Sequence, residues 1–523
     1  MLDVEGPQST HGQAARFDEL LAPVTSKDND ANFNRASATY KNLDERFRAA
    51  KRSYERQYAQ LYFSRLMLLK AVMRARVEQL WPGVPVCSIL DVPESREVAV
   101  IGTIYKNMKL KPSILDEYSK DRGLKAALGA TNFCADDDSV VLEDEGARMV
   151  LAVAGAGAAS TSSSGGGGGG DRGSVPLNVQ ELVTGVVMAV RGVAEPGGDF
   201  VVSAACFPGV APNPHPPPHL PLLPAAAATA LASSAPGDKY IALASGLCLG
   251  GSKADMLKTQ LALDFLTGNL GSPVEQRLSA QIVRLVVAGG CIGQLEALAG
   301  NGLGGGGSSN PYGRQSAAAQ GAALQPVRDL DLLLSEVAAG LPVDVMPGAE
   351  DPANVALPQQ PMHGCLFPAA GMHGSFVRAT NPHEFESDGV RFLGSSGQNV
   401  DDVAKYCALR DRLDLMQRSL ECRHLAPTAP DTLTCYPFHD RDPFILESTP
   451  HVYFVGNQPE FTTRLISVGG GGAGASGSGG SGGGGAVVRL VTVPSFARSG
   501  TVVLVNLRTL VCHPVRFDGS LGM

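Results

Sequence analysis

The sequence lacks closely spaced cysteines. Its ten cysteines are scattered from Cys87 to Cys512, and none forms a Cys-x-x-Cys pair. No zinc ribbon or iron–sulfur site can be read from that spacing, and a disulfide framework is not expected in a chain of 523 residues. We therefore predict that the thiols are reduced and mostly buried.

The sequence also lacks long apolar runs and an excess of positive charge. No run approaches the roughly 18 apolar residues that span a bilayer, and the N-terminus, MLDVEGPQSTHGQ, has no apolar core of a secretory signal. The net charge of −8 and the pI near 5.7 argue against nucleic-acid binding by the whole surface. We expect a soluble, intracellular protein.

Glycine and proline, in contrast, are abundant, with 62 and 35 residues. Most of this excess is clustered in stretches that cannot bury enough apolar surface to offset the entropy of ordering them. We predict flexible insertions at 154–174, 300–322 and 469–485, and a Pro/Ala-rich linker at 208–238. Residues 1–53 form an N-terminal segment that we expect to be partly disordered.

The pattern before the linker predicts a helix followed by an all-β domain, over residues 54–207. Apolar residues recur at helical spacing over Tyr54–Trp81, with the arginines and Lys70 on the remaining surface. Short strands separated by turn residues follow, which is typical of a small Greek-key barrel of the OB type.

The pattern after the linker, over residues 239–523, predicts an α/β layered domain with loops gathered at the strand ends. Seven strands are expected, at Tyr240–Ala244, Ile282–Ala288, Val343–Met346, Val390–Leu393, His451–Val455, Val487–Val493 and Thr501–Val511. Three helices are expected: one capped by Ser252 and Asp255, one with Pro326 in its first turn, and one long helix capped by Asn399 that reaches Leu420.

A glycine-rich turn, SGLCLGGSK at Ser245–Lys253, lies where a phosphate-binding loop would lie. Gly246 and Gly251 have the required separation, but the Ser-Lys order is reversed and the lysine is displaced. The turn therefore does not predict a nucleotide site.

The strand ends can instead be compared with a two-metal phosphoesterase, which needs carboxylate, imidazole and asparagine ligands converging from several loops. The expected motifs are Asp-x-His, Gly-Asp-x-x-Asp, Gly-Asn-His-Asp, a lone histidine and Gly-His-x-His. The residues found at the ligand positions are Gly246, Cys248, Gly290, Gly293, Ala349, Glu350, Ser396, Asn457 and Pro459.

These replacements predict a site without metal, cofactor or catalytic residue. Glycine and proline side chains donate no ligand atom, and without a bridging carboxylate nothing holds two dications close together against their repulsion. Glu350 and Asp351 remain as an acidic pair, to which we assign a solvated or loop-stabilising role. The alternative is that other histidines (His363, His373, His424, His439 and His451) act as substitute ligands, although their spacing is not that of a metal site.

With those residues in place, the chain resembles the small, B-type accessory subunits of replicative DNA polymerases, most closely those of eukaryotic DNA polymerase delta. The longest matching stretches are SFVRATNPHEFESDGVRFLGSSGQNVDD, RHLAPTAPDTLTCYPFHDRDPFILESTPHVYFVGNQPEF and LPVDVMPGAEDPANVALPQQPMHGCLFP. The resemblance implies an OB domain packed on an inactive calcineurin-like phosphodiesterase domain.

The resemblance further implies a nuclear, non-catalytic scaffold in DNA replication and repair synthesis. One surface would hold the cysteine-rich C-terminal region of the catalytic subunit, the OB side would hold the third subunit, and DNA would be contacted only indirectly or weakly. Two other classes of function stay open: a metal-dependent phosphodiesterase or 3′–5′ nuclease, and an OB-type single-strand DNA-binding protein. The second needs aromatics and a basic groove, of which Tyr105–Lys111 supplies a little positive charge.

Overall fold

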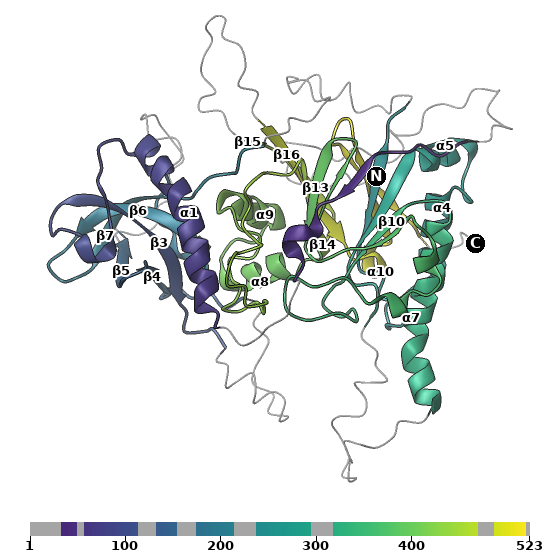
Figure 1. Ribbon diagram of the computed structural model, residues 1–523, viewed down its shortest axis with the longest axis horizontal. Coiled ribbons are helices and arrows are strands. Elements are labelled where there is room, and N and C mark those ends of the chain that lie inside the picture. The colour runs from purple at the N-terminus through teal and green to yellow at the C-terminus, as the bar shows by residue number, and fades with distance from the viewer. Residues whose placement is uncertain are drawn as a thin grey trace, which may run out of the picture.

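The computed structural model describes residues 33–49, 57–112, 132–153, 174–213, 237–293, 317–468 and 486–518. Those residues form three six-stranded sheets and the helices around them (Figure 1). Most of the predicted insertions and most of the linker lie outside the described residues. No helix within the described ranges is both long and apolar enough to cross a membrane.

The N-terminal unit is one sheet whose strand pairings close into a cycle, with the order β2-β3-β4-β5-β7-β6 and an additional β3–β6 pairing. Strands β5 and β7 are parallel, and the other pairings of the cycle are antiparallel. The elements are α1 (Ala59–Leu80), β2 (Val86–Cys87), η3 (Ile89–Asp91), β3 (Glu97–Asn107), β4 (Ser139–Glu143), β5 (Arg148–Val153), η4 (Val179–Glu181), β6 (Val187–Ala194) and β7 (Phe200–Cys206).

Helix α1 falls within the predicted span and lies on the side of this unit that faces the rest of the protein (Figure 1). Its side chains Leu66, Leu69, Met73 and Val77 pack against strands β3, β6 and β7. The helix is held by this packing, because an apolar stripe at helical spacing stabilises a helix mainly by burial against a neighbour.

The C-terminal unit stacks two six-stranded sheets face to face. One sheet has the order β11-β10-β9-β8-β17-β18 and the other β1-β12-β13-β14-β16-β15. The strands are β1 (Tyr40–Asn42), β8 (Tyr240–Ala244), β9 (Ile282–Ala288), β10 (Val343–Met346), β11 (Phe376–Arg378), β12 (His383–Ser387), β13 (Val390–Ser395), β14 (Val452–Gln458), β15 (Thr462–Val468), β16 (Ala486–Pro494), β17 (Thr501–Asn506) and β18 (Cys512–Arg516).

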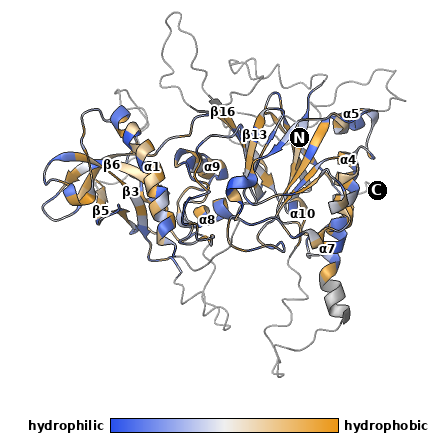
Figure 2. Ribbon diagram, viewed as in Figure 1, coloured by the Kyte–Doolittle hydropathy of each residue, from blue (hydrophilic) through white to orange (hydrophobic). Residues whose placement is uncertain are grey.

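The interior between the two sheets is apolar, and these strands are largely hydrophobic (Figure 2). Ile241 and Val286 of one sheet meet Phe392, Phe454 and Val491 of the other in a single buried cluster. The predicted bounds of β8, β9 and β10 are confirmed. Strands buried on both faces are largely apolar, and here only Arg284 and Asp344 interrupt the runs, which is why the sequence located these strands well.

Helices cover both outer faces of this stack. The helices beside β8–β10 are α4 (Met256–Thr267), α5 (Pro273–Gln281) and α7 (Ala317–Ala338), and those beside β13–β16 are α8 (Gln398–Tyr406) and α9 (Arg412–Glu421). Short turns complete the unit: η5 (Gly364–Leu366), η6 (Ala370–Met372) and α10 (Phe496–Ser499).

Three helix predictions were wrong in detail. Asp255 caps α4 by accepting from Lys258 N, and Ser252 lies outside the helix. Helix α7 begins at Ala317, so Pro326 lies inside it and the helix occupies the end of the predicted insertion 300–322. The predicted long helix is two helices, since α8 begins after Gly397 and ends before Cys407, where the chain turns to extended backbone.

Within the predicted N-terminal segment 1–53, residues 33–49 are part of the C-terminal unit. Strand β1 pairs with β12 at the edge of one sheet, and η2 (Asp44–Phe47) follows it. The Arg35 guanidinium donates to the backbone oxygens of Leu266, Ser279 and Ile282 at 2.7–2.9 Å. Residues 33–49 therefore run from one sheet to the other, as the purple ribbon of Figure 1 shows.

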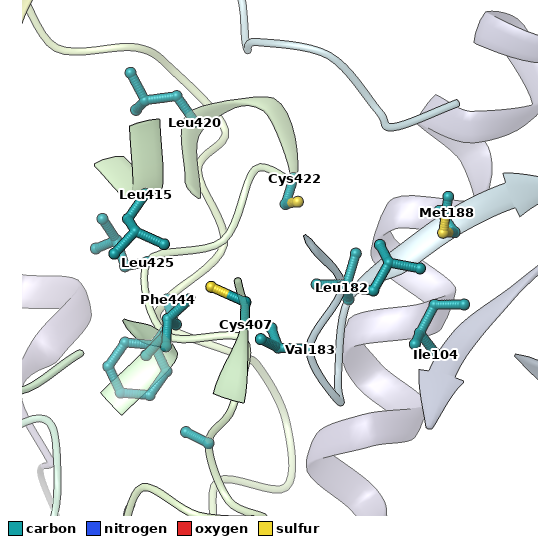
Figure 3. Close-up of a cluster of buried hydrophobic side chains, with 14 of the residues drawn as sticks. Ile104, Leu182, Val183, Met188, Cys407, Leu415, Leu420, Cys422, Leu425 and Phe444 are labelled. Atoms are coloured by element: carbon teal, nitrogen blue, oxygen red, sulfur yellow. The ribbon is translucent and has the colours of Figure 1, made fainter. Parts of the chain in front are cut away.

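The core is continuous across the predicted boundary between the two units (Figure 3). Ile104 and Leu182 of the N-terminal unit share one buried cluster with Cys407, Cys422 and Phe444 of the C-terminal unit. Apolar surface of both units is thus removed from water at the same place, and this burial favours a fixed arrangement of the two.

The cysteines follow the prediction of mostly buried thiols. All ten lie among the described residues, all are free, and six are buried. Burial raises the pKa of the Cys206 and Cys407 thiols to about 11, so these side chains behave as small apolar groups.

Candidate functional site

Four strands of the C-terminal unit end at one place, and the loops that follow them are in contact. We call the group formed by Gly246, Gly290, Ser396 and Asn457 the strand-end centre. Gly246 follows β8, Gly290 follows β9, Ser396 follows β13 and Asn457 lies at the end of β14. Parallel strands place such residues together at the carboxyl edge of the sheet.

The space at this centre is filled by side-chain and backbone atoms of the strand-end loops. A Cβ atom on Gly290 would lie 2.5 Å from Oδ1 of Asn457 and 3.0 Å from Cα of Gly246. A Cβ atom on Gly246 would lie 2.5 Å from Oγ of Ser495. Both glycines have positive φ, at +62° and +68°, a conformation that a residue with a side chain adopts only at a cost. An aspartate at either position would collide with its neighbours.

Asn457 occupies the middle of the centre and hydrogen-bonds to several loops. Its Nδ2 donates to the backbone oxygens of Ala288 at 3.2 Å and Ser396 at 2.8 Å, and its backbone N donates to Oγ of Ser245 at 2.8 Å. Its φ of +58° is tolerated because asparagine is among the few residues that enter the left-handed region readily. The side chain thus joins three strand ends.

Asp351 supplies a carboxylate next to this centre. It is 5% exposed and accepts from the backbone N atoms of Gly290, Cys291, Ile292 and Gly348 at 2.7–3.2 Å. Burial raises its pKa in spite of these donors. Since every donor is a loop amide, the carboxylate ties the β9 loop to the β10 loop. The loop-stabilising role expected of the acidic pair is therefore what Asp351 does, whereas Glu350 is exposed.

A neutral amide network extends the centre towards β12. Asn381 Nδ2 donates to Gln359 Oε1 at 2.8 Å, Ser396 Oγ at 2.7 Å and Gln398 Oε1 at 3.0 Å. Gln359 Nε2 in turn donates to the Gly348 oxygen at 2.9 Å. These residues satisfy one another with hydrogen bonds between uncharged groups, so the network carries no charge that would attract a cation.

The remaining predicted positions lie farther out. Gly293 lies close to the turn that contains Cys248. A Cβ atom on Gly293 would lie 2.8 Å from the backbone oxygen of Cys248. Ala349 and Glu350 are exposed, as is Pro459. Ala349 lines an open hollow of about 350 Å³ instead of facing the centre. The structure thus brings four of the nine positions together and places Gly293 and Cys248 in an adjoining turn.

The described residues contain no group of three or more histidine, cysteine, aspartate or glutamate side chains that could hold a metal ion. Four of the five alternative histidines have other partners. His424 Nε2 contacts Asp442 Oδ2 at 2.9 Å, His451 Nδ1 accepts from Arg391 N at 2.8 Å, and His373 Nε2 lies 3.2 Å from Ser335 Oγ. His363 Nδ1 accepts from the backbone N of Cys365.

A charged cluster that the sequence did not reveal joins the two units. We call Arg65, His424 and Asp442 the junction cluster. Arg65 was expected on the exposed side of its helix, yet its side chain is fully buried and its Nε donates to Asp442 Oδ2 at 2.8 Å. Its other nitrogens donate to the oxygens of Gly185, Pro427 and Ala429 at 2.6–3.1 Å.

In the junction cluster, Arg65 and His424 stabilise the charged form of Asp442. Burial alone would raise the pKa of Asp442, but His424 and Arg65 hold it well below its usual range. Burial, together with the nearby Arg65 charge, lowers the pKa of His424. A signal was present in the sequence, since Arg65 lies four residues from both Leu61 and Leu69 and so within the apolar stripe of α1.

A second buried cluster, which we call the N-terminal cluster, consists of Asp44, Arg284, Asp344 and His383. His383 contacts Asp44 Oδ1 at 2.7 Å through Nδ1 and Asp344 Oδ2 at 3.3 Å through Nε2. Arg284 donates to Asp344 Oδ1 at 2.5 Å. Burial alone would lower the pKa of His383, but the two carboxylates raise it to about 9. The cluster fastens residues 33–49 to both sheets.

Comparison with known proteins finds one family model within each of the two units. A family model for the B subunit of DNA polymerases alpha and epsilon matches residues 241–463, and one described as "DNA polymerase delta subunit OB-fold domain" matches residues 57–205. These two segments fall in the C-terminal and N-terminal units.

Full-length relatives are similar over most of the chain. A "DNA polymerase delta small subunit" of Arabidopsis thaliana is 40% identical over 497 residues, which cover 95% of this chain and 99% of the relative. A protein of the same name from Oryza sativa is 40% identical, covering 93% and 99%. One from Saccharomyces cerevisiae is 28% identical, covering 90% and 91%.

Proposed function

Because the chain belongs to the DNA polymerase delta small subunit family, we propose that it is a non-catalytic scaffold bridging the catalytic subunit and the third subunit. It is an accessory subunit of DNA polymerase delta and takes part in DNA replication. The bridging role, the lack of catalysis and placement in the nucleus are parts of the proposal.

The observation that carries the proposal is the closed strand-end centre. A two-metal hydrolase needs carboxylates that bridge its ions and an open position for water or substrate. Here Gly246 and Gly290 stand at ligand positions, and the amide of Asn457 fills the space between them. Carboxylate chemistry at this place would require the backbone to move, which supports a role without bond making or breaking.

We interpret the two units as an OB barrel and a calcineurin-like phosphoesterase sandwich. Support for the barrel comes from the closed cycle of pairings with its single parallel contact between β5 and β7. Support for the sandwich comes from two stacked sheets with helices on both outer faces. In this interpretation a former active-site scaffold serves as a platform for other proteins.

The N-terminal unit offers a surface suited to a protein partner, which we assign to the third subunit. A groove of about 410 Å³ lies between α1 and strands β3–β5, with Phe63 and Tyr105 among its lining residues. Phe63 is 50% exposed and Tyr105 37%. Exposed aromatics in a concave surface are typical of binding sites between proteins. Glu143 and Asp144, which also line the groove, make it a poor surface for a DNA backbone.

We assign the catalytic subunit's cysteine-rich C-terminal region to the C-terminal unit, with no cofactor contributed by this chain. Co-expression tests the scaffold. The full chain and a polymerase delta catalytic subunit are expected to co-purify as one complex, and adding the third subunit is expected to give a ternary complex. A catalytic subunit truncated before its cysteine-rich region serves as the control and is expected not to co-purify. Co-purification of the truncated form would contradict this assignment.

A nuclease assay tests the absence of catalysis. The purified chain with Mn²⁺ and single-stranded DNA is expected to give no cleavage above a metal-free control. Cleavage that survives repurification and disappears on Asp351→Asn substitution would support the phosphodiesterase alternative.

A further inference from the structure

Two arginines approach one residue of the segment that leaves the N-terminal unit. Arg423, which follows α9, donates from Nε to the Gly209 oxygen at 2.7 Å and from Nη2 to the Val210 oxygen at 3.3 Å. Arg76, on α1, also approaches Gly209: a Cβ atom on this glycine would be 3.9 Å from Arg76 Nε and 4.0 Å from its Cζ. Both guanidinium groups therefore border the same glycine.

Neither arginine has a carboxylate partner among the described residues. The ion pairs of the described chain include none to Arg76 or Arg423. Arg76 Nη1 donates only to the neutral Gln79 Oε1, at 3.2 Å, and its Nε is buried without an acceptor in that part of the chain. Burial lowers the pKa of Arg423, and the Arg76 charge lowers it further.

The nearby Arg418, unlike Arg76 and Arg423, has carboxylate partners. It stacks over the Phe207 ring at 4.6 Å and forms ion pairs with Glu181 at 2.8 Å and Glu421 at 3.4 Å. The carboxylates near this junction thus have a cationic partner already. Holding Arg76 and Arg423 near each other without a counter-charge is unfavourable, and an anion that binds both guanidinium groups removes this cost.

We propose that Arg76 and Arg423 form a binding site for a phosphate group at the junction of the two units. Guanidinium groups match phosphate geometry, since their planar N–H donors bind two oxygens at once. The buried Nε–H of Arg76 supplies one donor that is oriented by the fold. The phosphate can come from a small anion or from a nucleic-acid backbone, and the chemistry of the contact is the same.

Thermal unfolding of the full chain tests the site, with inorganic phosphate as the probe and chloride at equal ionic strength as the reference. Phosphate is expected to raise the Tm in a saturable way, because a ligand that binds only the folded state stabilises it. Isothermal titration calorimetry with the same probe gives the affinity. If neither phosphate nor the oligonucleotide described below has a saturable effect on the Tm, the proposal is overturned.

Three variants localise the effect. Arg76→Gln is expected to weaken phosphate binding about tenfold or more, the size of one charged hydrogen bond. In chloride alone its Tm should equal or exceed that of the wild type, since like-charge repulsion is relieved. Arg423→Gln should also lose the phosphate effect, with a lower Tm in every buffer because Gly209 and Val210 lose a donor. The exposed Arg74 of the same helix is the matched control, and Arg74→Gln should bind phosphate as the wild type does.

A short single-stranded oligonucleotide distinguishes the two sources of phosphate. Binding that depends on Arg76 would identify a nucleic-acid backbone, whereas binding of inorganic phosphate alone would identify a small anion. Phosphate affinity that is equal in the wild type, Arg76→Gln and Arg423→Gln would overturn the assignment.

Discussion

The strand-end centre and the junction cluster differ in the groups that they bury: the first buries uncharged groups, and the second buries an ion pair. At the strand ends, where an enzyme of this architecture would gather charged ligands, uncharged amides and backbone fill the space, and the nearby Asp351 is satisfied by loop N–H groups. At the junction, where no chemistry is expected, Arg65 and Asp442 form a fully buried ion pair.

The difference shows what each region is adapted to hold. Neutral groups with satisfied hydrogen bonds make a rigid but unreactive support. Buried opposite charges, in contrast, tolerate only one arrangement of their segments, because a lost partner leaves a charge without solvation. In this protein the buried charges join segments that are distant in the sequence, as expected of a scaffold that must keep its two units in register.

The largest effect is expected from breaking the junction cluster. Asp442→Asn leaves the Arg65 guanidinium buried without a carboxylate, which costs about 3–5 kcal/mol for pairs of this kind. The free energy of unfolding from urea titration of the full chain should fall accordingly, and limited proteolysis should cut between the two units sooner.

The control for this variant is an ion pair in solvent. Lys109 and Asp137 pair on the surface with side chains 76% and 53% exposed. Asp137→Asn is expected to leave the urea midpoint unchanged. Equal midpoints for the two variants would refute the view that the junction cluster holds the units together.

A pH titration sharpens the comparison at the N-terminal cluster. The pKa of His383 is raised from 6.5 to about 9 in the folded state. Because the pKa is raised, protonated His383 contributes to the free energy of unfolding in full below pH 6.5, and this contribution is lost as the pH rises through 9. The loss amounts to about 3 kcal/mol.

The measurement is the free energy of unfolding from pH 6 to pH 10, compared between the wild type and His383→Gln. The variant is expected to be less stable at pH 6 and to lose less stability as the pH rises. A variant with the same slope as the wild type would show that another group causes the pH dependence.

A carboxylate introduced into the strand-end centre is expected to lower the stability of the folded protein. In Gly290→Asp the new Cβ would lie 2.5 Å from Asn457 Oδ1, and the residue has a φ of +68°. Overpacking of this kind costs about 2 kcal/mol, and the Tm should fall without any gain in Mn²⁺ binding.

Gly340→Ala is the matched control for that substitution. Gly340 has nothing within 4 Å of its Cβ position, and its φ is not in the left-handed region. Its Tm is expected to stay within error of the wild type. A Gly290→Asp protein that kept its Tm and bound Mn²⁺ would show that the centre is open to ligands.

The sequence predicted those features that depend on residues close together in the chain. Strand β9 is apolar apart from Arg284, and Gly246 and Gly290 could be placed because each lies two residues after the end of a buried strand. The positions of Ala349 and Pro459 were not predictable in the same way, since spacing along a loop does not determine which way the loop turns. The break between α8 and α9 contains neither glycine nor proline, and only the cap Asp411 marks it.

The charged clusters depend on residues far apart, and this is why they were missed. Arg65 and Asp442 are separated by 377 positions, and Asp44 and His383 by 339. No periodicity links such residues. A lone arginine within an apolar stripe indicates that a buried partner exists, but it does not identify that partner.

The smallest effect is expected from a second ion pair on α1, which differs from the Arg65 pair mainly in exposure. Lys70 Nζ lies 2.7 Å from Glu145 Oε2, with side chains 19% and 31% exposed. Glu145→Gln should lower the free energy of unfolding by about 0.5 kcal/mol, because water solvates both groups once the pair is broken. The loss should shrink further in 1 M salt, whereas the loss in Asp442→Asn should not. If the two variants cost the same, burial would not be what gives the junction cluster its strength.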